Sequence, residues 1–263
     1  TATVRQILDR VQEHTDLDVI AITDHDDIRA AWEAQQLAGA YRLEIIPGIE
    51  VTTLQGHLLA LFLRQPVKML RSLEWTIQAV HDQGGVCVAP HPLSWLTRSL
   101  GERAVRRAAP QLDGIEVINP SLAGRVTAAK VASLNERELH LPETGSSDAH
   151  HLLGVGSAFT QFDGHTADDF RRSLLNKTTR AGGNFVWHRE MTGVMKARTT
   201  YRWHKYILRD AAQPGGRGPG AGGRQDASDL RPQDSGLRTQ DSGLSTQHSL
   251  STCLLYTSPS PRD

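Results

Sequence analysis

Short apolar runs alternate with helical patterns along most of this chain, and this alternation constrains the fold more than any other feature. Four runs of strand length cover residues 19–23, 43–49, 58–63 and 85–89. Amphipathic helical spacing occupies residues 28–40, 73–83, 103–109, 122–137 and 167–176. Strands that alternate with helices predict an α/β fold with a parallel sheet, either closed into a barrel or doubly wound.

Each of these apolar runs borders a histidine or an acidic residue. Asp24 and His25 follow the first run, and Glu50 follows the second. His57 opens the third run, and His91 comes just after the fourth. Functional side chains of such folds gather at the C-terminal ends of the strands. We therefore expect these residues to lie close together.

The segment from Gly145 to His150 adds a further pair of candidate ligands. It follows a short apolar run at residues 139–141 and carries Asp148 and His150, two residues apart. In extended backbone, residues i and i+2 point the same way, so the pair could bind one ion or two neighbouring ions. Taken alone, a strand-end turn with its usual aspartate explains the segment better. The other candidate ligands favour the metal interpretation.

The candidate ligands are all nitrogen or oxygen donors: His25, Glu50, His57, His91, Asp148 and His150. Such a set without thiolate is typical of a catalytic cluster of zinc, manganese or iron. Cys87 lies inside its apolar run, so a buried apolar role fits it better than a ligand role. Seven further histidines are interpreted as ordinary surface or tail residues: His14, His81, His140, His165, His188, His204 and His248.

Six segments resemble, in order, the motifs of the PHP (polymerase and histidinol phosphatase) superfamily. They are Ile22-Thr-Asp-His25-Asp, Pro47-Gly-Ile-Glu50-Val, His57 before its apolar run, Ala89-Pro-His91-Pro, Glu116-Val-Ile-Asn119 and Gly145-Ser-Ser-Asp148-Ala-His150. The resemblance covers roughly residues 1–183. It implies a distorted (β/α)7 barrel that hydrolyses phosphate esters. Two or three divalent ions would serve as cofactors: manganese, zinc or iron, with magnesium as a further candidate.

The resemblance also implies roles for individual residues. The six candidate ligands correspond to metal ligands of the family, and Asp24 would orient an imidazole from outside the coordination shell. Family members carry an additional opening His-x-His motif, which is absent from this sequence. We therefore expect an N-terminally truncated barrel without its first strand, with exposed neighbouring edges. Such a fragment would be impaired or inactive, although its full-length parent would be an enzyme.

The expected reaction follows from the ligand chemistry. Divalent ions lower the pKa of bound water from about 15.7 toward roughly 7, so a metal-bound hydroxide can attack the phosphorus. Glu50 suits a bridging role because a carboxylate has two oxygens. Arg98 and Arg125 are candidate phosphate contacts, since arginine binds phosphate in a bidentate manner. His151, next to His150, could also reach the substrate. That substrate would be a small phosphorylated metabolite or a nucleotide.

Two other functions remain open at this point. One is a non-catalytic PHP barrel that binds metal or a protein partner of unknown identity. The other is a zinc hydrolase of the amidohydrolase type, which would place a carboxylated lysine on a middle strand. No lysine lies at a predicted strand end. The six intact ligand positions favour the phosphoesterase.

The chain changes character after residue 183. Residues 184–210 form a basic extension, either a helix that packs on the barrel or a face for nucleic acid or another anionic surface. Residues 211–263 are rich in Gly, Ser, Gln, Asp and Pro, so we expect a disordered tail. The end of this tail resembles a translated sequencing adaptor, which would make it a sequencing or gene-prediction artefact.

Composition excludes several other classes of protein. The 29 basic and 29 acidic residues balance, so no strong nucleic-acid footprint is present. Two cysteines exclude a disulfide framework. No run approaches the roughly 18 apolar residues of a membrane span. These features predict a soluble cytoplasmic enzyme without a membrane partner.

Overall fold

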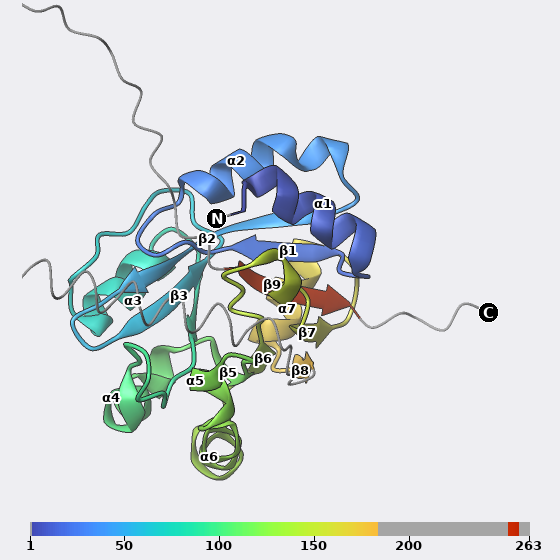
Figure 1. Ribbon diagram of the computed structural model, residues 1–263. Helices are drawn as coiled ribbons and strands as arrows, with labels where there is room; N and C mark the ends of the chain where they lie inside the picture. The colour runs from blue at the N-terminus through green and yellow to red at the C-terminus, as the bar shows by residue number, and fades with distance from the viewer. Residues whose placement is uncertain (1, 184–251, 258–263) are drawn as a thin grey trace, which may run out of the picture. The chain divides into compact units, whose positions relative to one another are not determined.

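The strands form one curled, mixed sheet in the computed structural model, which describes residues 2–183 and 252–257. Their order across the sheet is β6-β5-β4-β3-β2-β1-β9-β7-β8 (Figure 1). The strands are β1 (Val19–Ile22), β2 (Glu44–Thr52), β3 (His57–Leu61), β4 (Val86–Ala89), β5 (Gly114–Ile118), β6 (Glu143–Gly145), β7 (Ala158–Phe162), β8 (Arg180–Gly183) and β9 (Thr252–Thr257).

The sheet is not purely parallel, contrary to the expectation from the sequence. The pairs β1–β2, β4–β5 and β5–β6 are parallel, whereas β3 runs antiparallel to both β2 and β4. Only residues 53–56 connect β2 to β3, and so short a connection permits an antiparallel pair but no parallel crossover. As a result, the start of β3 lies beside the end of β2.

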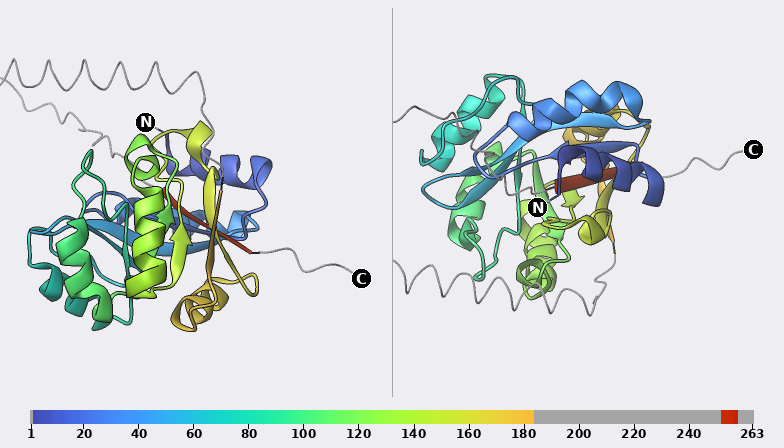
Figure 2. Two further views of the ribbon diagram at one scale, coloured as in Figure 1. Left: turned by 90° about the horizontal axis from the view of Figure 1, so that it is seen from below. Right: turned by 45° about the horizontal axis from the view of Figure 1, so that its top comes forward.

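The two halves of the sheet curve toward each other (Figure 2). Gly145 on β6 and Thr160 on β7 meet across this curve, where the Thr160 hydroxyl accepts from the Gly145 N–H at 3.1 Å and donates to its carbonyl at 3.0 Å. A Cβ at position 145 would lie 2.5 Å from the Phe159 carbonyl oxygen, so this approach requires glycine. The α/β class is confirmed. The seven-stranded barrel without its first strand stays a prediction.

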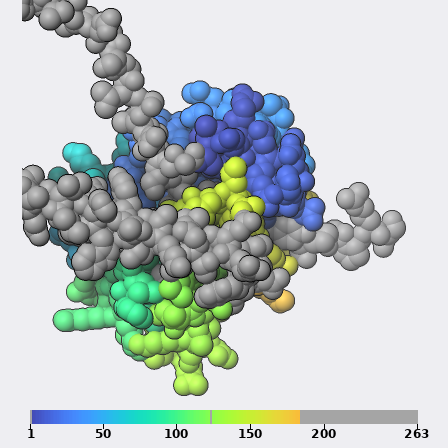
Figure 3. Space-filling model, viewed as in Figure 1, coloured from blue at the N-terminus to red at the C-terminus, as the bar shows by residue number. Residues whose placement is uncertain are grey.

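Helices cover the sheet on its outer sides. They are α1 (Val4–His14), α2 (Arg29–Leu37), α3 (Leu73–His81), α4 (Gly101–Ala108), α5 (Leu122–Arg125), α6 (Ala128–Leu134) and α7 (Ala167–Leu175). Short turns of other helix types are η1 (Ala38–Ala40), η2 (Ala109–Gln111), η3 (Asn135–Leu139) and η4 (Leu152–Gly154). Helices α1 and α2 lie side by side, and the segment around η4 packs against α1 (Figure 3).

Local sequence signals explain where the helices begin. Thr3 and Gln6 form a capping box at the start of α1, and Ser72 caps α3. The helical pattern at 122–137 is divided between α5, α6 and η3. The interruption lies at Thr127, whose N–H donates to the Gly124 carbonyl at 3.2 Å and makes a tight turn.

Strand β9 differs from the expectation of a disordered tail. It pairs antiparallel with β1 and parallel with β7, and so covers the edge of β1 that would otherwise be unpaired. Its sequence, Thr-Cys-Leu-Leu-Tyr-Thr, is rich in residues that favour strands. The disordered tail over residues 211–263 stays a prediction. The predictions for residues 184–251 and 258–263 lie outside the described residues.

Among the described residues, no helix has the length and apolar character needed to cross a membrane.

Candidate metal centre

Three imidazoles surround the buried carboxylate of Glu50. The Oε1 atom lies 2.9 Å from Nδ1 of His57 and 3.0 Å from Nε2 of His91. The Oε2 atom lies 3.6 Å from Nδ1 of His25. The ring centroids of His25 and His57 are 4.8 Å apart, and those of His57 and His91 are 5.8 Å apart. Four of the six predicted ligands therefore converge.

Sheet geometry brings these four residues together. The turn after β1 pairs with β2, where the N–H of Glu50 donates to the Asp24 carbonyl at 3.1 Å and the N–H of Asp26 donates to the Glu50 carbonyl at 3.2 Å. On the other side, Glu50 is paired with Leu59 of β3. His57 is two residues from Leu59, so it shares the face of Glu50 as a diagonal neighbour.

Opposite charges stabilise one another in this cluster. Burial by itself would raise the pKa of Glu50, but hydrogen bonds from His57 and His91 outweigh it and hold that pKa well below its usual range. Burial lowers the pKa of His91, whereas the hydrogen bond and charge of Glu50 raise it more, to about 9. The carboxylate is therefore ionised and strongly attracts positive charge.

A second buried carboxylate, Glu116 on β5, holds the loops around this cluster. It accepts hydrogen bonds from the backbone N–H of His91 at 2.6 Å, from Nδ2 of Asn119 at 2.9 Å and from the hydroxyl of Ser146. Burial raises its pKa to about 7, and the nearby His91 lowers it in part. The site assignment from the sequence omitted Glu116, although Glu116-Val-Ile-Asn119 was among the family motifs.

Asp148 and His150 lie at the same end of the sheet, but not in the way the sequence suggested. Strand β6 starts at Glu143, after the apolar run, and it ends at Gly145. Asp148 has a left-handed backbone with φ of 45°, so the extended geometry expected for the pair is wrong. Nδ1 of His150 instead turns back to within 3.0 Å of the Asp148 carbonyl oxygen.

Asp148 is coupled to the histidine cluster. Its carboxylate lies 3.4 Å from Nδ2 of Asn119. Burial raises its pKa, and the negative charge of Glu50 raises it further. In turn, Asp148 contributes to the raised pKa of His91. All six predicted ligands are thus gathered at one end of the sheet.

The other predicted site residues lie around this end. Asp24 is buried directly before His25. Arg98 is exposed, its guanidinium donates to the Thr53 carbonyl at 3.2 Å, and its own carbonyl accepts from the His57 N–H at 3.0 Å. Arg125 is exposed at the end of α5, and His151 is half-buried just before η4. Arg98 is therefore tied to the backbone of a candidate ligand.

The donor set fits divalent metal ions. His25, Glu50 and His57 each offer a ligand atom, and these atoms lie within 4.8 Å of one another. The donors are nitrogen and oxygen only, which suits zinc, manganese or iron. Nδ1 of His91 lies 3.2 Å from the Thr97 hydroxyl, a contact that fixes the ring with Nε2 directed at Glu50.

Part of the sequence is similar to known proteins. Residues 130–179 match the family described as PHP-associated. The uncharacterized protein MJ1587 of Methanocaldococcus jannaschii is 37% identical over 115 residues, which cover 44% of this chain and 65% of that protein. This chain therefore spans slightly less than two thirds of the length of that relative.

Two solved structures share the fold. One is a two-domain protein from Bacteroides vulgatus ATCC 8482 that contains a predicted PHP-like metal-dependent phosphoesterase. Its TM-score is 0.55 at 21% identity, over 69% of this chain and 60% of that one. The other is PsfC from Pseudomonas syringae PB-5123, with a TM-score of 0.51 at 19% identity, over 76% of this chain and 88% of that one. At these identities the likeness concerns the fold.

Proposed function

We propose that this chain, which belongs to the PHP superfamily, hydrolyses phosphate esters with divalent metal ions held around Glu50. The observation that carries the proposal is the ring of imidazoles on the two oxygens of this one buried carboxylate. Because Oε1 and Oε2 face different histidines, Glu50 is suited to bridge two ions.

Each of the six clustered residues has a proposed place as a ligand of the metal ions. Glu50 would be shared, with His25 on the Oε2 side and His57 and His91 on the Oε1 side. Asp148 and His150 would complete the site from the loop after β6. When bound, divalent ions would lower the pKa of a water nucleophile and neutralise the charge of the phosphate.

Residues outside the coordination shell have separate proposed tasks. The Thr97 hydroxyl can accept the Nδ1 proton of His91, which leaves the Nε2 lone pair free to bind a metal. Glu116 holds the His91 backbone, and Asp24 holds the Glu50 backbone through its carbonyl. These contacts keep the donors in place before an ion arrives.

Arg98 is the best placed candidate for gripping the phosphate. It is exposed, and its backbone is hydrogen-bonded to His57 at the edge of the cluster. Its guanidinium donates to the Thr53 carbonyl through one nitrogen, which leaves other donors available. Arg125 and His151 are further proposed contacts. The substrate class is a small phosphorylated metabolite or a nucleotide.

The decisive experiment compares metal binding and hydrolysis in the same protein. The full chain is stripped with a chelator and reloaded with Mn²⁺ or Zn²⁺. Bound metal is then measured by elemental analysis, and hydrolysis is assayed with p-nitrophenyl phosphate and bis(p-nitrophenyl) phosphate. We expect Glu50→Gln to reduce turnover about 100-fold or more, because it removes the shared carboxylate. Glu33→Gln, an exposed change on α2, serves as the control.

The outcomes separate the proposals clearly. If Glu50→Gln binds as much metal as the wild type, the assignment of the centre is wrong. If the wild type binds metal but hydrolyses neither ester, the enzymatic proposal fails for this chain. Arg98→Ala should raise KM if the residue grips phosphate equally in the ground and transition states.

A further inference from the structure

A second group of potential ligands lies at the opposite end of β4 from His91. It consists of His81 at the end of α3, Cys87 on β4 and Asp113 just before β5. Each offers one ligand atom, and these atoms lie within 4.8 Å of one another. This combination of imidazole, thiol and carboxylate is separate from the centre around Glu50, which contains no sulfur.

Two backbone contacts fix the geometry of this group. Strands β4 and β5 are parallel neighbours, and the N–H of Asp113 donates to the Cys87 carbonyl at 2.8 Å. In the reverse direction, the N–H of Cys87 donates to Oδ2 of Asp113 at 2.7 Å. Nε2 of His81 lies 2.8 Å from the same oxygen. The Asp113 carboxylate is thus bonded both to the His81 side chain and to the Cys87 backbone.

This arrangement was not predicted from the sequence. His81 was interpreted as an ordinary surface histidine, but it is only half-exposed and is paired with Asp113. Cys87 is buried, as expected from its apolar run. Asp113 lies 26 residues beyond Cys87 in the sequence, so only the pairing of β4 with β5 brings the two together.

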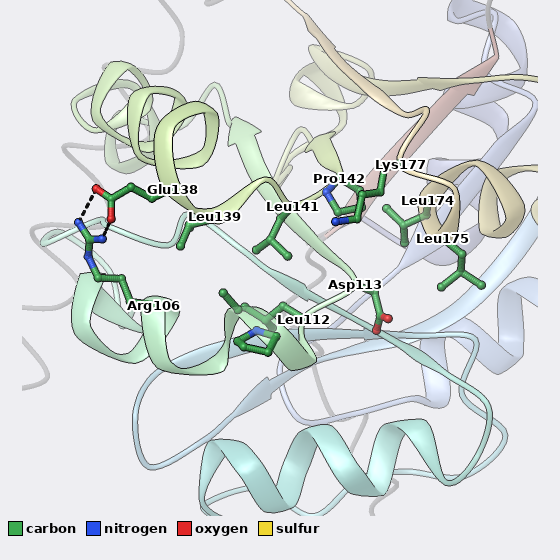
Figure 4. A pocket seen from close by; sticks show the side chains of 12 residues that line it. Arg106, Leu112, Asp113, Glu138, Leu139, Leu141, Pro142, Leu174, Leu175 and Lys177 are labelled. Carbon is green, nitrogen blue, oxygen red and sulfur yellow. Dashed lines mark hydrogen bonds and ion pairs between the residues drawn. The ribbon is translucent and has the colours of Figure 1, made fainter.

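An ion could reach this group from solvent. Asp113 lines a pocket of about 560 Å³ beneath β5 and β6, together with Leu112, Pro142 and Lys177 (Figure 4). The side chains of His81 and Asp113 are 34% and 19% exposed, whereas the Cys87 residue is fully buried. The thiol is therefore the innermost of the three ligand groups, whereas the side chains of His81 and Asp113 reach solvent.

The ligand types suit zinc better than the other common divalent ions. Zinc accepts cysteine, histidine and aspartate, and three protein ligands with one water complete its tetrahedral shell. Bond lengths of about 2.0–2.3 Å place tetrahedral ligand atoms roughly 3.5 Å apart, whereas the three atoms here lie within 4.8 Å of one another and Nε2 of His81 is 2.8 Å from Oδ2 of Asp113, so the side chains would have to adjust on binding an ion. His81 is the most exposed of the three side chains and so has the most freedom to adjust.

The Cys87 thiol could act as a ligand only if a bound ion stabilised its thiolate form. Burial raises the pKa of the Cys87 thiol well above its usual range, and the negative charge of Asp113 raises it further. A divalent ion reverses this effect, because its positive charge stabilises the thiolate and replaces the proton. The alternative is a His81–Asp113 pair that merely anchors α3 to the sheet.

We propose that His81, Cys87 and Asp113 form a second divalent-cation site, selective for zinc, at the end of the sheet opposite the Glu50 centre. An ion bound there would clamp the end of α3 to β4 and β5. The proposal does not depend on the proposed hydrolytic activity, because it concerns different residues and a different ligand chemistry.

Cobalt(II) provides a direct test, since only a thiolate ligand gives a sulfur-to-cobalt charge-transfer absorption. The full chain contains one other cysteine, Cys253, so the titration uses a Cys253→Ser background. We expect saturating Co²⁺ to produce the absorption and excess Zn²⁺ to abolish it. The absorption should persist in Glu50→Gln, which alters only the other centre. Absence of the absorption in the Cys253→Ser protein would overturn the proposal.

A variant of His81 tests the site without changing the buried Cys87. His81→Gln changes a half-exposed side chain and should lower zinc affinity at least about 10-fold, measured by competition with a chromogenic chelator. The matched control is His165→Gln, because His165 also pairs with an aspartate, Asp18, at 3.2 Å. Equal zinc affinity in His81→Gln and His165→Gln would show that the His81–Asp113 pair is only structural.

Discussion

Nδ1 of His57 lies 2.9 Å from Oε1 of Glu50, across the antiparallel pair of β2 and β3. His57 is the first residue of β3 and Glu50 lies near the end of β2, whereas the other candidate ligands follow the ends of their strands. The reversed direction of β3 therefore brings the start of one strand to the ends of its neighbours. The short connection between β2 and β3 thus places His57 in the candidate metal centre.

The Glu116 carboxylate should be essential for holding that centre. Glu116→Gln replaces one acceptor oxygen by an NH2 group that faces hydrogen-bond donors. We expect the free energy of unfolding at pH 8 to fall by about 1–3 kcal/mol, because a buried polar contact is lost. Metal affinity should fall as well, since His91 loses its anchor. Urea unfolding with and without Mn²⁺ measures both effects, and an unchanged midpoint would contradict the role assigned to Glu116.

Gly124 provides a steric test of the position of Asn119, which contacts the Glu116 carboxylate. A Cβ at this position would lie 2.4 Å from the carbonyl oxygen of Asn119 and 2.5 Å from its Cβ. Gly124→Ala should therefore displace Asn119 and destabilise the protein by about 1–3 kcal/mol in urea unfolding. Gly39→Ala is the matched control, since nothing lies within 4 Å of the added methyl group. Equal stability of the two variants would show that the loop moves freely.

Asp169 should make stability depend on pH at the start of α7. The Thr166 hydroxyl and the backbone N–H groups of His165 and Thr166 lower the pKa of Asp169 to about 2, below its unfolded value of about 3.9. A lowered carboxyl pKa stabilises the folded state above the unfolded pKa, and this contribution is lost as the pH falls toward 2. The wild type should therefore melt higher than Asp169→Asn at pH 6, and the difference should vanish near pH 2.

Asp168→Asn is the control for this measurement, because Asp168 is exposed in the same helical turn. It should change the melting temperature little across the range. A constant difference between wild type and Asp169→Asn from pH 6 to pH 2 would show that the pKa of Asp169 is not lowered by folding.

Strand β9 should contribute to stability through its pairing with β1 and β7. A chain that stops at residue 246 would leave both of these strands with an unpaired edge. Such edges invite aggregation, so we expect a lower melting temperature and increased light scattering. A chain that stops at residue 257 retains β9 and should behave like the full chain. Identical melting of both shortened chains would show that the pairing of β9 adds no stability.

Local structure and the kinds of ligand could be predicted from the sequence. Residues 73–83 and 167–176 were predicted as helices, and α3 and α7 follow those bounds closely because Ser72 and Thr166 cap them. The apolar runs before His25, Glu50 and His91 were recognisable because a buried strand needs continuous apolar residues. These signals depend only on neighbours along the chain.

The contacts between distant groups depend on how the strands pair. Glu116 and Ser146 are 30 residues apart, and His81 and Asp113 are 32 residues apart, so no local pattern could pair them. A left-handed turn at Asp148 stands where an extended strand was expected, and its carboxylate lies 3.4 Å from Nδ2 of Asn119. Periodicity specifies which face of an element is buried, whereas strand direction and register specify what that face contacts.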